Sequence, residues 1–139
     1  MVNFSNEGKP VVVLIDFNIS RKFQDPDTSN IFVMLTNTGT AKYQAPEQLS
    51  SHDSYGYSCQ IDNWSAGAVL YFLLTGGIHA FNFSDQLVIE NKILEADFDK
   101  SIAEYCCLSE DAKCLIKGLM TVSVPDRMTA QQALNHRWL

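Results

Sequence analysis

Asp16 is the residue whose type and position point most directly to chemistry. It follows five apolar residues, 11–15, most of them β-branched, and this run predicts a buried strand that ends at Asp16. A carboxylate at the end of a buried strand is a natural ligand for a hard cation, and Mg²⁺ needs only one or two such ligands beside phosphates and waters. The alternative, an aspartate that only caps the turn after the strand, would be the better interpretation if Asp16 stood alone.

A second segment of interest is Gly39-Thr40-Ala41-Lys42-Tyr43-Gln44-Ala45-Pro46-Glu47. The residues before it, 22–38, are polar and contain Pro26 within a cluster of Asp, Thr, Ser and Asn, which predicts a loop. The length of this loop suits a regulated segment, so we expect Asp16 and Glu47 to mark the two ends of one functional region.

The rest of the chain predicts helices. Residues 61–74 are apolar on every side after Asp62 and Asn63, which predicts a helix inside the core that ends at Gly76-Gly77. Three further helices are expected to begin at capping residues: Ser84, for a helix through residue 95; Ser109, before Glu110 and Asp111; and Thr129, in the capping-box sequence Thr129-Ala130-Gln131-Gln132. One strand followed by four helices predicts a mainly α domain.

Composition and charge exclude several classes of partner. The chain has 139 residues, 46% of them hydrophobic, which is enough for one core. Its net charge is −6 and its ten basic residues are scattered, so nucleic acid is not expected as a partner. No apolar run approaches the roughly 20 residues of a membrane span, and the first residues lack the basic region of a secretion signal, so no membrane partner is expected either.

The cysteines do not predict a metal site. Cys59, Cys106, Cys107 and Cys114 lack paired C-x-x-C spacing, and the three histidines lie far from them in the sequence. We expect buried, reduced thiols and therefore a cytoplasmic location.

The order of these segments resembles that of protein kinases from about residue 11 to residue 139. Asp16-Phe17-Asn18 resembles the Asp-Phe-Gly magnesium motif, and Ala45-Pro46-Glu47 resembles the Ala-Pro-Glu motif that closes the activation segment. Asp62-Asn63-Trp64-Ser65-Ala66-Gly67 is similar to the start of the family's central buried helix. The resemblance implies a mainly α fold, the C-terminal lobe of a kinase, which is a helical bundle with a short β-strand element at the N-terminus.

The resemblance also implies roles for single residues. Asp16 would bind Mg²⁺ and, with it, ATP, while Phe17 would distinguish active from inactive states by its packing. Thr40 would hydrogen-bond the catalytic aspartate and lysine. Asp62 would hold the backbone of the catalytic loop, with a simple helix N-cap as the alternative.

Arg127 matches the arginine that pairs with the Ala-Pro-Glu glutamate, here Glu47. Elementary electrostatics supports this pairing, because a buried glutamate is unfavourable to ionise alone and an arginine fork can satisfy both of its oxygens. We therefore expect the two side chains to be in contact.

Within the family, the closer resemblance is to calcium/calmodulin-dependent and calcium-dependent serine/threonine kinases. Residues 70–77, 109–116 and 130–139 carry it, and Thr40-Ala41 in place of the tyrosine-kinase pattern implies Ser or Thr substrates. Thr36 and Thr38 lie where the family often carries an activating phosphate, with an unmodified threonine as the alternative.

The chain also departs from the family pattern. Asn18 replaces the glycine of the magnesium motif, and because Asn tolerates the left-handed backbone, we expect it to bias the conformational switch without abolishing metal binding. Residues 78–81 lack the usual prolines of a substrate-facing loop. The 139 residues contain no glycine-rich loop and no His-Arg-Asp sequence, and Asn3 matches the metal-binding asparagine of the catalytic loop poorly.

We therefore expect residues 1–139 to be a partial kinase domain, with the magnesium-motif strand, the activation segment and the C-lobe helices, but without the nucleotide lobe and catalytic loop. The complete domain would transfer the γ-phosphate of ATP to protein Ser or Thr with Mg²⁺, and its partners would be a protein substrate and the missing N-terminal half. We expect this part alone to be inactive. The alternative is a non-catalytic kinase-like module that binds a partner protein through the helical face near residues 84–94.

Overall fold

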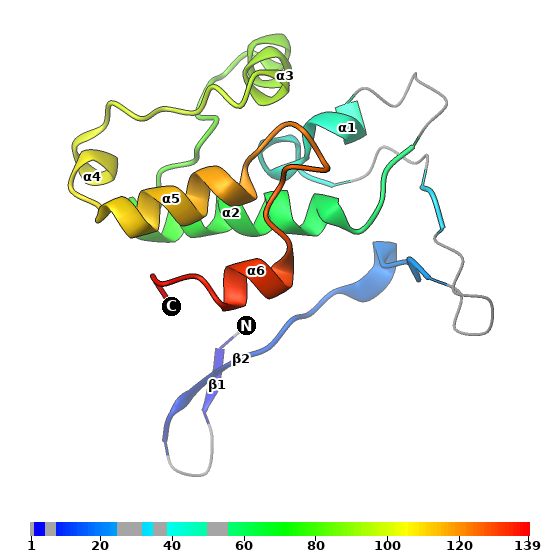
Figure 1. The fold of residues 1–139 in the computed structure, drawn as a ribbon, viewed down its shortest axis with the longest axis horizontal. Helices are drawn as coiled ribbons and strands as arrows, with labels where there is room; N and C mark the ends of the chain where they lie inside the picture. Colours follow the sequence, from blue (N-terminus) through cyan, green and yellow to red (C-terminus); the bar gives the residue numbers. More distant parts are fainter. Residues whose placement is uncertain (1, 5–7, 25–31, 35–38, 50–55) are drawn as a thin grey trace.

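The computed structural model describes residues 2–4, 8–24, 32–34, 39–49 and 56–139. Within them a two-stranded hairpin precedes a helical body (Figure 1). The helices are α1 (Pro46–Leu49), α2 (Gln60–Leu74), α3 (Gln86–Leu94), α4 (Ala103–Cys106), α5 (Glu110–Leu119) and α6 (Ala130–Leu134), with short 3-10 turns η1 (Phe17–Ile19) and η2 (Ala41–Tyr43). The predicted mainly α fold with a β element at the N-terminus is confirmed.

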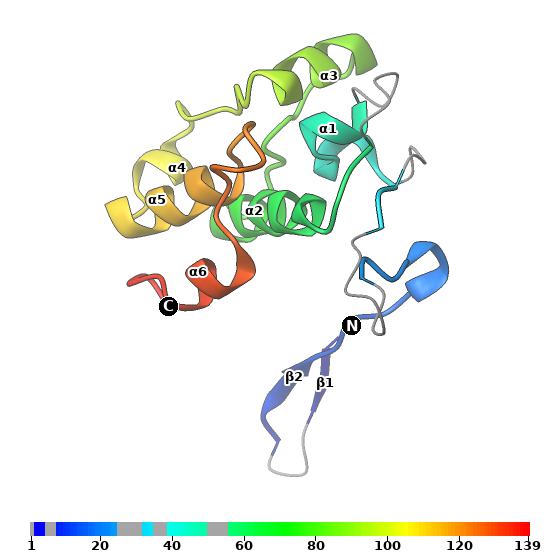
Figure 2. The ribbon, with the colours of Figure 1, turned by 45° about the vertical axis from the view of Figure 1, so that its right-hand side comes forward.

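The hairpin pairs β1 (Val2–Phe4) with β2 (Pro10–Val12) in antiparallel register, with Val2 opposite Val12. It extends away from the helices in both views of the ribbon (Figures 1 and 2). The prediction of a buried strand over residues 11–15 is wrong, because β2 ends at Val12 and Val12 is 82% exposed. Two short strands bury little by themselves, and no second layer within the described chain covers this apolar run.

The core lies between α2 and α5, which run side by side (Figures 1 and 2). Trp64, Ala68 and Tyr71 recur at helical spacing and form the buried side of α2. On α5 the buried positions repeat in the same way, as the sequence predicted, and include Leu115, Ile116 and Leu119. The core is completed by Ala45, Ala80, Phe81, Ile89, Ile93, Phe98, Tyr105 and Met120.

Only one side of α2 is buried, although its sequence predicted a helix surrounded by core. The opposite side carries Val69 and Leu73, and Leu73 is 68% exposed. Asp62 and Ala66 are exposed on the same side. The apolar side chains on the outer side of this helix are therefore not covered by any of the described residues.

Capping residues set the helix starts largely as predicted. Ala112 N–H donates to Ser109 Oγ at 3.2 Å, and the capping box of Thr129 and Gln132 is formed, so both of these predictions are confirmed. The prediction for Ser84 is wrong by one residue, because the backbone N–H of Leu87 donates to Asp85 Oδ1 at 2.9 Å. The carboxylate is the better acceptor at the positive end of the helix dipole.

The prediction of buried cysteines is wrong as well. Cys106, Cys107 and Cys114 are exposed free thiols, and Cys59 is half-buried. Tyr105 points into the core from the single turn of α4, whereas Cys106 and Cys107, which follow it at the end of this turn, face solvent. Cys114 lies off the buried face of α5. Among the described helices none is long and apolar enough to cross a lipid bilayer.

Gly67 lies at a close contact between α2 and the end of α5. A Cβ atom at this position would lie 2.7 Å from Met120 Cγ and 2.9 Å from Leu119 Cβ, closer than packed atoms tolerate. The Leu119 Cβ is fixed to the backbone, so relief requires the two helices to separate.

We predict that Gly67→Ala destabilises the fold by about 1–3 kcal/mol in urea unfolding, because overpacking outweighs the higher helix propensity of alanine, which is worth about 1 kcal/mol. Gly118→Ala is the matched control. Its added Cβ would meet the terminal Cε of Met128 at 2.6 Å, and a flexible methionine end can move aside. Equal losses in the two variants would contradict the explanation.

Candidate functional site

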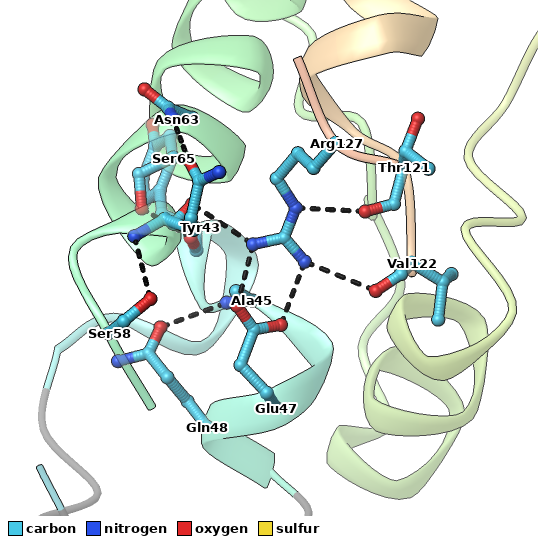
Figure 3. A network of polar contacts seen from close by, with 11 residues as sticks. Tyr43, Ala45, Glu47, Gln48, Ser58, Asn63, Ser65, Thr121, Val122 and Arg127 are labelled. Carbon is cyan, nitrogen blue, oxygen red and sulfur yellow. Dashed lines mark hydrogen bonds and ion pairs between the residues drawn. The ribbon is translucent and has the colours of Figure 1, made fainter. Parts of the chain in front are cut away.

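The Arg127 guanidinium is the centre of a buried polar network (Figure 3). Its Nη1 and Nη2 atoms donate to Oε1 and Oε2 of Glu47 at 2.6 and 2.8 Å, a bidentate pair. The remaining N–H groups donate to the backbone carbonyl oxygens of Gln60 at 3.0 Å, Thr121 at 2.9 Å and Val122 at 3.3 Å. All five donors of the side chain are used, and the pairing expected of Glu47 and Arg127 is present.

This network joins segments that are distant in the sequence. Glu47 lies in α1, Gln60 opens α2, and Thr121 and Val122 follow α5. The side chain of Arg127 is 0% exposed and that of Glu47 is 16% exposed, and the guanidinium carbon lies 5.3 Å from the centre of the Trp64 ring. The ion pair is therefore shielded from water, and it connects the end of the Gly39-to-Glu47 segment to the core.

Two further hydrogen bonds hold the same segment, and neither was among the contacts expected from the sequence. Ser65 Oγ on α2 donates to the carbonyl oxygen of Tyr43 at 2.8 Å. The backbone N–H of Ala45 donates to the Oε1 of buried Gln48 at 2.9 Å (Figure 3). Ala45 and Pro46 are themselves buried, so this part of the segment belongs to the core.

Thr40 and Asp62 line one cavity of about 270 Å³, together with Gly39, Tyr43 and Ser65 among other residues. Asp62 lies in the first turn of α2, and the N-cap is Cys59, so Asp62 is not the N-cap residue considered above. Asp62 is exposed at the surface of α2, but partial desolvation of its carboxyl raises its pKa above the usual value. Within the described chain neither Thr40 nor Asp62 has a side-chain hydrogen bond, and both remain available to an outside group.

Asp16 does not line this cavity. It precedes η1 with a positive φ of 64°, and its side chain makes no capping hydrogen bond. Asn18 lies within η1 and does not occupy the left-handed region, so the backbone conformation expected of Asn18 is found instead at Asp16. Phe17 is exposed and contributes nothing to the core.

The remaining residues predicted from the sequence lie away from this cavity or outside the described part of the chain. Thr36 and Thr38 lie outside the described residues. Asn3 lies in β1, opposite Val11 in the ladder. Gly67 is the helix contact analysed above.

The chemistry available to these residues is limited. In the described part of the chain no group of three or more His, Cys, Asp or Glu side chains is arranged to hold a metal. Asp16 offers a single hard carboxylate, which fits a cation that takes most of its ligands from phosphates and water, as Mg²⁺ does. It does not fit a metal that requires a complete protein cage.

Comparison with known proteins identifies the same family in the family model and in the individual relatives. The model of the protein kinase domain matches residues 2–139. The chain is 36% identical over 128 residues to "Probable serine/threonine-protein kinase fhkE" of Dictyostelium discoideum, which covers 91% of this chain and 17% of that protein. It is 35% identical over 136 residues to a probable myosin light chain kinase of the same organism, covering 97% of this chain and 36% of that protein.

A third relative is calcium-dependent protein kinase 3 of Plasmodium berghei, 31% identical over 135 residues, which covers 97% of this chain and 23% of that protein. The chain thus spans 17% to 36% of the length of these relatives. The resemblance to serine/threonine kinases, including calcium-dependent ones, is confirmed.

We predict that Arg127→Ala destabilises the fold by about 3–5 kcal/mol, because it leaves the buried Glu47 carboxylate without its counter-charge. The urea midpoint measures the loss. Arg137→Ala is the control, since its exposed pair with Asp111 should contribute less than about 1 kcal/mol. An unchanged midpoint for Arg127→Ala would show that the ion pair does not support the fold.

Proposed function

The chain belongs to the protein kinase domain family, and on this premise we propose that it forms the C-terminal lobe of an ATP-dependent serine/threonine kinase. The observation that carries the proposal is the bidentate pair of Glu47 and Arg127, because it secures the end of an activation segment on the helical body. The family uses ATP and Mg²⁺ and acts on proteins. A cytoplasmic location and Ser or Thr acceptors belong to the same proposal.

Asp16 is proposed as the ligand of Mg²⁺ and through it of ATP. Its carboxylate follows the hairpin and is free of any capping bond, so it can accept a cation. When bound, the metal would neutralise charge on the phosphates. The 139 residues contain no phosphate-binding glycine loop, so the nucleotide would need residues beyond them.

Thr40 and Asp62 are proposed to support the catalytic loop from the cavity they share. The Thr40 hydroxyl would hydrogen-bond the catalytic aspartate and lysine, and Asp62 would accept backbone N–H groups of that loop. Such hydrogen bonds would favour the ionised form of Asp62 and oppose the effect of burial on its pKa. Phosphorylation of Thr36 or Thr38 is proposed to regulate the segment.

A second candidate function is a protein-binding module without catalysis. The observation in its favour is the outer surface of α3, where Leu87 is 69% exposed and lies near the partly exposed Val88, Leu94 and Phe83. Exposed apolar side chains on one helix and on the residues just before it are typical of a docking surface.

We predict that residues 1–139 alone transfer no phosphate from [γ-³²P]ATP to a Ser-containing peptide above a blank without protein, because the positioning groups are lacking. A longer native product that continues upstream into a His-Arg-Asp loop should be active. In that product Asp16→Ala should lower kcat by at least about 100-fold, since the metal contributes several kcal/mol of transition-state stabilisation.

Glu104→Ala is the control for loss of one exposed carboxylate and should retain activity. Activity of the 139 residues alone, abolished by Asp16→Ala, would contradict the predicted inactivity. A native protein of only this size without phosphotransfer would favour the binding module.

A further inference from the structure

We propose that Cys106 and Cys107 form a modification site, a pair of adjacent thiols that a hydroperoxide oxidises to an intramolecular disulfide, and that this oxidation loosens the core through Tyr105. The two cysteines close the single turn of α4, and both are exposed free thiols. Neither lines the cavity that Thr40 and Asp62 share. Both ribbon views place α4 toward the end of the helical body opposite α1, so the site is separate from the one proposed for phosphotransfer (Figures 1 and 2).

The two thiols are held differently. The Cys106 thiol donates to the backbone carbonyl oxygens of Lys100 at 3.6 Å and Ser101 at 3.8 Å, which directs its sulfur toward the segment before α4. The Cys107 sulfur has no hydrogen bond within the described residues. The thiolate is the nucleophile and a donating thiol is protonated, so Cys107 is the sulfur that reacts first. Cys106 then supplies the second thiol, and such a neighbouring cysteine is typical of redox-sensor sites.

The proposed reaction consumes one hydroperoxide for each disulfide. The Cys107 thiolate attacks one oxygen of ROOH, the O–O bond breaks, and the departing oxygen takes a proton and leaves as ROH. The Cys106 sulfur then attacks the sulfenic acid on Cys107, and the S–S bond forms as the S–O bond breaks and water leaves. The two thiols are oxidised by two electrons in total, and the peroxide is reduced by the same number.

The peptide group between the two cysteines is part of the small ring that the disulfide closes. Its carbonyl oxygen accepts from Lys113 Nζ at 3.1 Å, and its N–H donates to the carbonyl oxygen of Ala103 at 3.0 Å. Adjacent Cα atoms lie about 3.8 Å apart, below the range of about 4.4–6.8 Å that is usual for disulfides, so ring closure requires this peptide group to turn. Oxidation therefore breaks both hydrogen bonds and opens the end of α4.

The change is confined to a short element and is reversible. Because α4 is a single turn, few backbone hydrogen bonds oppose its opening. The hydrogen bonds of the reduced form favour the dithiol, and exposed or constrained disulfides are the ones that other thiols reduce readily. The disulfide should therefore form with peroxide and disappear when a reducing thiol is added.

Tyr105 connects this turn to the core. It directly precedes Cys106 and is only 3% exposed, and its ring lies 5.7 Å from that of Tyr71 on α2 and 5.9 Å from that of Phe98. Burial and, next, the charge of Glu110 raise the pKa of the Tyr105 hydroxyl, so it is neutral at pH 7. This buried hydroxyl has no hydrogen-bond partner among the described residues. No hydrogen bond anchors the ring, so a displacement at the end of α4 changes its packing against α2.

The test treats the reduced 139-residue chain with a small excess of hydrogen peroxide, blocks the remaining thiols with iodoacetamide and locates them by tandem mass spectrometry. We expect a loss of about 2 Da, the mass of two hydrogen atoms, and a disulfide between Cys106 and Cys107 that dithiothreitol reduces. Cys107→Ser should abolish this disulfide. In Cys106→Ser the reaction should stop at a sulfenic acid on Cys107, which dimedone traps.

Cys114→Ser is the matched control, because it removes another exposed free thiol, from α5, and should leave the disulfide intact. Thermal unfolding measures the effect on the core, and near-ultraviolet circular dichroism reports the packing of the tyrosines. Oxidation should lower the Tm of the unmodified sequence and of Cys114→Ser by at least about 2 °C, as the loss of about one hydrogen bond predicts. The Tm of Cys107→Ser should not change with peroxide.

Complete alkylation of both thiols after peroxide, a disulfide between two chains, or a sulfinic acid on Cys107 in place of the intramolecular disulfide would overturn the proposed site. An intramolecular disulfide that leaves the Tm and the near-ultraviolet spectrum unchanged would overturn the connection to the core. These measurements need neither ATP nor phosphotransfer, so their outcome is independent of the test of the proposed function.

Discussion

The buried pair of Glu47 and Arg127 is the interaction on which the rest of the structure depends. An ion pair shielded from water is favourable only when its remaining donors are satisfied, and here every N–H of the guanidinium has an acceptor. Three of these acceptors are backbone carbonyls from the start of α2 and the segment after α5. The requirement to satisfy one side chain therefore fixes how the segment that ends at Glu47, the helix α2 and the C-terminal region meet.

The segment from Gly39 to Glu47 has an exposed beginning and a buried end. Its end is held in the core by Ala45, Pro46 and Gln48, whereas Thr40 and Asp62 face a cavity with side chains that have no hydrogen bond in the described residues. The apolar side of α2 at Leu73 and the hairpin are also open to solvent. The described residues thus leave the polar side chains of Thr40 and Asp62 and the apolar surface of α2 without a covering partner.

Much of this could be predicted from residue patterns. The caps at Ser109 and Thr129 and the spacing of α5 are local, since helix starts and faces depend on residues three or four positions apart. The burial of residues 11–15 and of the cysteines was predicted incorrectly, because burial depends on which other element lies opposite. The contact of Ser65 with Tyr43 could not be predicted either, because a polar residue in an apolar helix gives no sequence signal for a partner 22 positions away.

The sequence by itself determined the family, the mainly α composition and the identity of the charged pair, since ordered motifs and helical periodicity are properties of the linear chain. Only the tertiary structure decided that Arg127 bonds three backbone carbonyls beside Glu47 and that the approach of α5 leaves no space for a Cβ atom at Gly67. These contacts join residues up to 80 positions apart, and such distances follow from the packing of helices.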